Sequence, residues 1–334
     1  MQRALNIELL RIVCMLFIVI GHIGGRGGVG FPFGLNLMPH HVDCFILISG
    51  YFLITAKFKF ERILRTLIET IFYTFTITFI LFCFGLADFY ELAKSIFPIA
   101  PTKFNYWFVT KYLAVLLMSP FLSKLCLSLT QRGYECLLLS LLLISSTLFA
   151  VFPFGVLFGG GFSLLWMITM FVTGGYLRLY EPKFNHWGWC MLVLLVTYNL
   201  CSHFAGGIVK LGYNSLITYT LAIATFMWFK NMRISETSIF AKIVVFVAPH
   251  IFAVYLIHEH GQIRTTYIVE WFKEFVGLMP DTIYLLLFGC VVMLVSVLVD
   301  KVRVKMFDIL KLKECIQQLG KRIDSYYKEV FTSE

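Results

Sequence analysis

Residues 7–23 read IELLRIVCMLFIVIGHI, an apolar run long enough to cross the hydrocarbon core of a bilayer as an α-helix. The run does not alternate apolar with polar residues, which excludes a half-buried strand. A bilayer offers no water to unpaired backbone groups, so runs of this length have to be helical. Nine further runs follow, at residues 42–56, 67–86, 106–122, 136–152, 162–178, 188–204, 213–229, 241–258 and 282–299. The sequence therefore predicts an all-α integral membrane protein, a polytopic bundle of about ten transmembrane helices.

The composition of the whole chain also points to the membrane. Of its 334 residues, 59% are hydrophobic and 14% are charged, whereas soluble domains carry about 25% charged residues. This excludes a soluble globular enzyme. The formal net charge of +9 comes from loops and the tail rather than from a basic face of a soluble module, so we expect no nucleic-acid partner.

The Lys and Arg residues divide unevenly between the two sides of the predicted bundle. Twenty lie in the termini and alternate loops, seven lie in the other loops, and Arg11 lies inside the first run. Because cytoplasmic loops carry the excess of positive charge, we expect both termini in the cytoplasm. Residues 1–300 then form the transmembrane domain. Residues 301–334 form a cytoplasmic tail. The spacing of its apolar residues is typical of an amphipathic helix that rests on membrane lipids.

Ionisable side chains at the first two runs are the first candidates for a function, since charge inside a membrane is costly. Arg11 and His22 lie eleven residues apart, so they project from nearly the same helix face about 16 Å apart. Asp43 opens the second run on the side of His22, where a carboxylate would orient an imidazole that acts as a general base. In the alternative interpretation, Glu8 simply pairs with Arg11, and His22 sits at the outer interface.

A cluster of four basic residues precedes the third run. Two of them, Arg62 and Arg65, are three residues apart on one helix face, which suits planar guanidinium groups bracketing one polyphosphate. The alternative is an ordinary basic cytoplasmic loop on anionic lipid.

In the second run, Ser49 is followed by a glycine. This pair is typical of close helix packing, and a serine acyl relay is the alternative.

Five segments, in this order, resemble the bacterial membrane-bound acyltransferase 3 family: RALNIELLRIVCMLFIVIGH (3–22), FILISGYFL (45–53), ERILRT (61–66), WFVTKYLAVLLMSPFL (107–122) and AVYLIHEH (253–260). The resemblance implies an acyl-CoA-dependent O-acyltransferase of the bacterial inner membrane. It implies acetyl-CoA or another short acyl-CoA as the donor substrate, with no permanently bound cofactor. The implied acceptor is a surface polysaccharide or a lipid-linked saccharide. The chain resembles the stand-alone kind, without the SGNH domain of longer members.

The resemblance also assigns residues. Arg11 and His22 match the family's arginine and histidine pair, and Arg62 and Arg65 match its RxxR pair. We therefore expect His22 to be the catalytic base and Arg11, Arg62 and Arg65 to bind the donor phosphates. Asp43 is expected as the partner of His22 from its position alone, not from the resemblance. The aromatic fourth segment and the YLxH segment supply the substrate-binding residues, which are Trp107, Tyr112, Tyr255 and His258.

One position departs from the family pattern. Glu259 follows His258 where the family is expected to have proline, which leaves the role of this corner open. We expect no metal site there, because His258 and His260 diverge on a helix and no third ligand is near in sequence.

Two other classes of function compete with the enzyme. Intramembrane charges also suit a secondary transporter or a flippase for a glycan or small solute, and a basic tail suits a scaffold of an envelope complex. No inverted repeat is visible, and the polar residues gather in the first three runs, which favours the enzyme. The loop 258–281 mixes charged and aromatic residues, as either an acceptor site or an interfacial anchor would.

Overall fold

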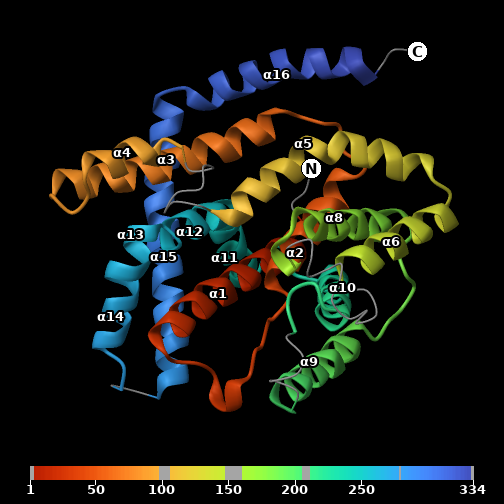
Figure 1. Ribbon diagram of the computed structural model, residues 1–334, viewed down its shortest axis with the longest axis horizontal. Helices are drawn as coiled ribbons and strands as arrows, with labels where there is room; N and C mark the ends of the chain where they lie inside the picture. Colours follow the sequence, from red (N-terminus) through yellow and green to blue (C-terminus); the bar gives the residue numbers. More distant parts are fainter. Residues whose placement is uncertain (1–3, 98–105, 147–159, 205–210, 278–279, 332–334) are drawn as a thin grey trace.

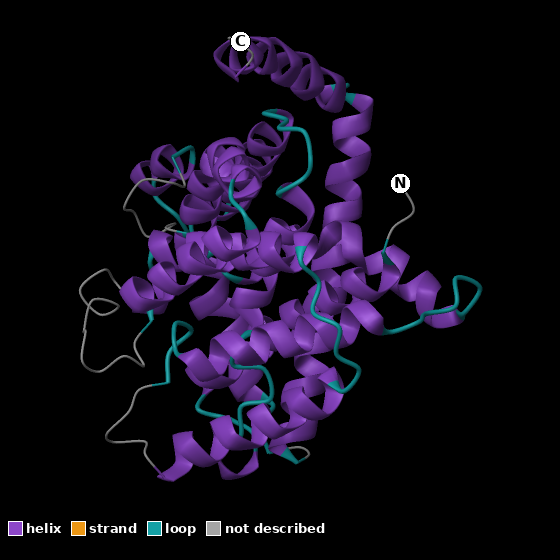
Figure 2. Ribbon diagram, turned by 90° about the vertical axis from the view of Figure 1, so that its right-hand side faces the viewer, coloured by secondary structure: helices purple, strands orange, loops and turns teal. Residues whose placement is uncertain are grey.

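The structure is a computed structural model that describes residues 4–97, 106–146, 160–204, 211–277 and 280–331. Within these ranges the chain is helical and contains no β-strand (Figure 2). The first half contains α1 (Leu5–Gly27), η1 (Pro32–Gly34), α2 (His41–Leu53), α3 (Glu61–Cys83), α4 (Phe89–Ser95), α5 (Trp107–Ser128) and α6 (Gln131–Ser145). The second half contains η2 (Gly160–Phe162), α8 (Leu164–Leu179), α9 (Trp187–Phe204), α10 (Leu216–Asn231), α11 (Ile239–Val247), η3 (Ala248–His250), α12 (Ile251–His258), α13 (Gly261–Ile263), η4 (Arg264–Ile268), α14 (Val269–Glu274), α15 (Asp281–Ile309) and α16 (Leu312–Phe331).

Six of these helical segments are long and apolar enough to cross a membrane: α1, α3, α5, α9, the pair α11–α12, and α15. Their outward surfaces are apolar, as on α15, where Val291, Leu294 and Leu298 are about half exposed. Apolar surface of this extent is stable in lipid and not in water. The chain is therefore a multi-pass membrane protein.

The predicted count of ten spans is not confirmed. The runs at 42–56 and 162–178 correspond to the shorter apolar helices α2 and α8, of 13 and 16 residues. A helix of 13 residues is about 20 Å long, less than the roughly 30 Å of a hydrocarbon core. The predicted run 136–152 begins within α6, and its part beyond residue 146 lies outside the described residues.

Helix α2 is a short helix in the core of the bundle. It packs against α1, α8 and α10, and its apolar residues are mostly buried. Two glycines allow the close approach of α2 and α8. A Cβ on Gly50 would overlap the carbonyl oxygen of Phe171, and a Cβ on Gly174 would overlap that of Leu47. This supports the packing interpretation of the Ser49–Gly50 pair, since small residues let membrane helices approach closely.

The ninth predicted span is interrupted. Helix α11 ends before Pro249, whose ring cannot continue a helix, and the turn η3 leads into α12. The interruption is anchored to α15: His250 Nδ1 donates to Asp300 Oδ2 at 2.6 Å, and the hydroxyl of Tyr73 donates to Asp300 Oδ1 at 2.6 Å. Asp300 is fully buried and also pairs with Arg303. These contacts fix the point from which α12 runs toward His258.

The tail contains two helical pieces rather than one. Helix α15 continues past residue 300 to Ile309, and Lys311, with φ 53°, separates it from α16. Figure 1 shows α15 rising to α16, which then turns across the molecule above α3. Asp324 Oδ1 accepts a hydrogen bond from the backbone N–H of Phe60 at 2.7 Å, and Gly320 lies against Glu61. Helix α16 therefore packs on the start of α3.

Candidate active site

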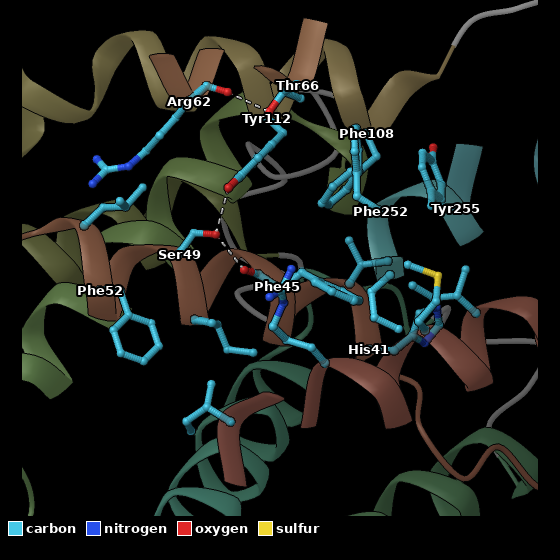
Figure 3. Close-up of a pocket in the computed structure, with 18 of the residues that line it drawn as sticks. His41, Phe45, Ser49, Phe52, Arg62, Thr66, Phe108, Tyr112, Phe252 and Tyr255 are labelled. Atoms are coloured by element: carbon cyan, nitrogen blue, oxygen red, sulfur yellow. Dashed lines mark hydrogen bonds between the residues drawn. The ribbon is translucent and has the colours of Figure 1, made fainter. Parts of the chain in front are cut away.

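A cavity of about 990 Å³ runs through the bundle between α1, α2, α3, α5 and α12 (Figure 3). Arg11, Arg62 and Arg65 line one part of it, and His22 lines another. We refer to these parts as the arginine end and the histidine end. Along α1 the two ends are about 16 Å apart, since eleven residues separate Arg11 from His22. The structure thus brings together, around one space, the residues that the sequence placed on separate helices.

The middle of the cavity is mainly apolar. Its walls there are formed by Met15, Ile18, Phe45, Ile48, Phe108 and Phe252. The predicted substrate-binding residues Trp107, Tyr112 and Tyr255 also line it. The fourth, His258, contacts His22 rather than the cavity itself.

At the arginine end, two of the three guanidinium groups are paired with carboxylates one turn away. Arg11 Nη1 lies 3.0 Å from Glu8 Oε2, and Arg65 Nη2 contacts Glu61 Oε1. The Glu8–Arg11 pair is the one that the alternative sequence interpretation expected. Arg62 donates to the backbone carbonyl of Lys57 at 3.2 Å. Three guanidinium groups around one opening can offer bidentate hydrogen bonds to phosphate oxygens.

At the histidine end, a chain of hydrogen bonds fixes the tautomers of two imidazoles. His258 Nδ1 lies 2.6 Å from the carbonyl oxygen of Val254, which can only accept, so Nδ1 carries the proton. In the neutral ring, His258 Nε2 is then an acceptor. It lies 3.1 Å from His22 Nδ1, which therefore donates. His22 Nε2 retains its lone pair, and no hydrogen bond to it is formed by the residues that the structure describes.

Glu259 completes this arrangement. Its Oε1 lies 3.3 Å from His22 Nδ1, 2.7 Å from Arg26 Nη2 and 3.2 Å from Arg264 Nη1. Burial raises the pKa of Glu259, but His22 and Arg26 outweigh that effect, so its pKa lies below the ordinary value. The hydrogen bond to His258 holds the imidazole of His22, and an ionised carboxylate beside it can stabilise by its charge the imidazolium that forms when Nε2 takes a proton.

The predicted pairing of Asp43 with His22 is not formed. Asp43 is buried, and its Oδ1 accepts a hydrogen bond from Trp166 Nε1 at 2.9 Å. Its other oxygen, Oδ2, has no hydrogen-bond partner among the described residues. Asp43 lies in the first turn of α2, which packs most extensively on α8, and its side chain is directed to Trp166 of that helix rather than to His22 on α1. The carboxylate beside His22 is that of Glu259.

Two further residues at the cavity wall were missed by sequence reasoning. His41 Nδ1 donates to the carbonyl of Met38 at 2.5 Å, so Nε2 is its acceptor atom, and the hydroxyl of Tyr213 lies 3.4 Å from it. Both residues line the cavity. His41 was visible as an ionisable residue beside Asp43, but Tyr213 lies in a distant run, and nothing in its local sequence connects it to this site.

Comparison with known proteins gives one decisive match. The model of a family described as an acyltransferase domain matches residues 5–301, which is most of the chain. The chain belongs to the acyltransferase 3 family. No curated protein and no solved structure matches it. The matched region contains all the predicted site residues and ends within α15, before that helix ends at Ile309.

Membership of the acyltransferase 3 family supports acyl transfer as the chemistry of this site. Such a reaction needs a group that removes the proton from the attacking atom. His22 Nε2, with its proton-free lone pair at the cavity wall, can serve as that group. The acyltransferase also carries Arg11, Arg62 and Arg65 at the opposite end of the same cavity, which Arg178 lines as well, and an anionic part of a substrate would bind there.

Proposed function

We propose that the protein transfers an acyl group, most simply acetyl, from acyl-CoA to a hydroxyl of a surface polysaccharide or lipid-linked glycan precursor. One observation carries this proposal. A single cavity has three guanidinium groups at one end and an oriented imidazole at the other, about 16 Å away along α1. That separation is of the same order as an extended pantetheine arm between its phosphates and its thioester.

The donor fits the cavity in one direction. Its phosphates bind at Arg11, Arg62 and Arg65, where phosphate oxygens replace the carboxylates of Glu8 and Glu61. Its pantetheine arm lies along the apolar walls, and its thioester reaches His22. The acceptor enters from the histidine end, beside the segment that follows α12.

The reaction balances with this chain's own residues. His22 Nε2 takes the proton of the acceptor hydroxyl while the oxygen attacks the thioester carbonyl carbon, and the carbon–sulfur bond then breaks. The thiolate of CoA leaves with the proton from His22. The negative charge of Glu259, 3.3 Å from His22 Nδ1, stabilises the intermediate imidazolium. This direct route requires both substrates in the cavity together, so initial-rate plots intersect, whereas a covalent acyl-histidine would give the parallel lines of ping-pong kinetics.

The distribution of positive charge supports a location in the bacterial inner membrane with both termini and the arginine end in the cytoplasm. Acyl-CoA then enters from the cytosol, and the glycan is modified outside. Cysteine labelling tests this orientation. We expect position 22 to react from outside and positions 62 and 65 from inside. Labelling of all three from one side contradicts the orientation.

The function is tested by replacing the base. His22→Ala should lower acyl transfer at least about 100-fold with normal abundance in the membrane and unchanged acyl-CoA binding. His203→Ala, which changes an exposed histidine at the end of α9, is the matched control and should behave as the wild type. Mass comparison of surface glycans from cells with and without each variant reports the acyl group and its host sugar. Retained acylation in His22→Ala contradicts the proposal.

A further inference from the structure

The apolar middle of the cavity contains one polar contact that the mechanism does not use. The Ser49 and Tyr112 hydroxyl oxygens lie 3.3 Å apart, and Ser49 Oγ also lies 3.0 Å from the carbonyl oxygen of Phe45 (Figure 3). Ser49 is on α2 and Tyr112 is on α5, so the contact joins opposite sides of the cavity.

The protons of this contact can be assigned. The carbonyl of Phe45 can only accept, so the Ser49 hydroxyl donates to it. Ser49 has no second proton, and Tyr112 must therefore donate to Ser49. Both hydroxyl protons are used within the protein. The lone pairs left on Tyr112 and Ser49 make the pair an acceptor, ready for an N–H or O–H donor of a ligand.

The same assignment excludes Ser49 as an acyl relay. Its proton is directed to a backbone carbonyl, which cannot act as a base, and the described residues place no imidazole or carboxylate in hydrogen-bond contact with it. A role in binding is the remaining chemistry for a polar pair that lines the cavity.

The pair also lies at a defined depth. Helix α2 begins at His41, which lines the cavity near the histidine end and follows the end of α1 through the connection 28–40. Ser49 is eight residues farther along, about 12 Å from that end. A pantetheine arm whose thioester sits at His22 carries two amide N–H groups, and the amide farther from the thioester comes closest to this depth.

We propose that Tyr112 and Ser49 form an acceptor site for the amide N–H farther from the thioester, and so select pantetheine thioesters as donors. The inference rests on the proposed function, because it assumes a thioester donor lying between the arginine end and His22. In an apolar wall such a hydrogen bond is strengthened by the low local polarity. A donor that lacks this amide gains nothing from the pair.

Three donors test the proposal with the purified protein in detergent. Acetyl-CoA and S-acetyl-pantetheine contain both amides, whereas S-acetyl-N-acetylcysteamine contains only the amide nearer the thioester. In Tyr112→Phe, we expect kcat/KM for the first two donors to fall about five- to tenfold, the value of one hydrogen bond. The third donor should change less than about twofold.

Two further variants test the Ser49 side of the site and control for the loss of a tyrosine hydroxyl. Ser49→Ala removes the group that orients the Tyr112 hydroxyl and should show the same donor selectivity in weaker form. Tyr284→Phe removes a tyrosine hydroxyl that donates to the carbonyl of Phe272 outside the cavity, at 3.1 Å, and should leave all three donors unchanged.

The outcomes separate this inference from the proposed function. If the wild type transfers acetyl from acetyl-CoA, but Tyr112→Phe affects all three donors equally or none of them, the amide site is wrong and the function stands. If the wild type binds and uses none of the thioesters, the acyl-CoA donor is wrong, and the amide site is overturned with it.

Discussion

The Nδ1 atom of His22 lies 3.3 Å from Oε1 of Glu259, although the two residues are 237 positions apart in the chain. Arg26 and Arg264 contact the same carboxylate. The position at which the resemblance led us to expect proline therefore carries the carboxylate that lies beside the proposed base. In the proposed mechanism Glu259 is a positioning residue, since it would act on the reaction through His22.

Removing the charge of Glu259 should impair catalysis and spare donor binding. In Glu259→Gln, we expect kcat to fall about 10- to 100-fold, because Nδ1–H loses the carboxylate that stabilises the imidazolium. Isothermal titration with CoA should give an unchanged Kd. Glu270→Gln, an exposed residue of α14 paired with Lys273, is the matched control. Equal kcat values for the two variants would show that Glu259 does not act on His22.

The depressed pKa of Glu259 predicts how its contribution to stability depends on pH. Its ionised form is favoured in the folded protein, so this stabilisation is complete above the ordinary carboxyl pKa of about 4.3. It is lost as the pH falls through the lower folded value. The difference in Tm between the wild type and Glu259→Gln should be constant from about pH 7 to 5 and shrink below that. A difference that grows in acid contradicts this.

Asp43→Asn distinguishes the two carboxylates. The amide oxygen of asparagine can still accept from Trp166 Nε1, as Asp43 Oδ1 does at 2.9 Å, so folding should be preserved. Because Asp43 makes no hydrogen bond to His22, kcat should stay within about threefold of the wild type. A decrease in kcat as large as that in Glu259→Gln would show that Asp43, and not only Glu259, acts on His22.

The arginine end should control donor affinity. Replacing both Arg62 and Arg65 with alanine should raise the KM for acyl-CoA about 10- to 100-fold, since each removes charged hydrogen bonds to phosphate. The KM for the acceptor should not change. Arg233→Ala removes an exposed guanidinium that does not line the cavity, and it should leave both KM values unaltered. If the double variant has the same KM for acyl-CoA as Arg233→Ala, Arg62 and Arg65 do not bind the donor and only mark the cytoplasmic side of the membrane.

The α2–α8 contact should be intolerant of a single methyl group. Gly50→Ala places a Cβ against the carbonyl of Phe171 and should destabilise the protein by about 1–3 kcal/mol or prevent its folding. Gly25→Ala on α1 meets no atom within 4 Å, and it should be neutral or stabilising, as alanine favours helices. Thermal unfolding in detergent compares them. Equal Tm values would mean that the helices can separate.

Sequence reasoning found the long spans because their signal is local. The runs at 7–23, 67–86 and 282–299 lie within α1, α3 and α15 or overlap them closely, since a long apolar run determines a helix without help from its neighbours. It could not distinguish a spanning helix from a short core helix such as α2, because both are equally apolar. The interruption at Pro249 was readable from the proline itself.

The site was predictable along one helix and not between helices. The face shared by Arg11 and His22 follows from the helical repeat alone. Which carboxylate meets His22 depends on how α12 packs beside α1, and sequence proximity to the outer edge favoured Asp43 over Glu259. The Tyr112–Ser49 contact likewise joins two helices. The sequence motifs identified both residues as candidates, but they could not predict that the two hydroxyl groups are in contact.

The packing of α16 on the start of α3 has a consequence for the order of assembly. Asp324 binds the backbone just before Glu61 and Arg62, and Gly320 fits closely against that turn. Helix α16 leaves the ribosome after every other helix that the structure describes. The segment that presents the arginine pair is therefore braced only after all the other described helices have been synthesised, so the contacts of the histidine end can form before the arginine end is complete.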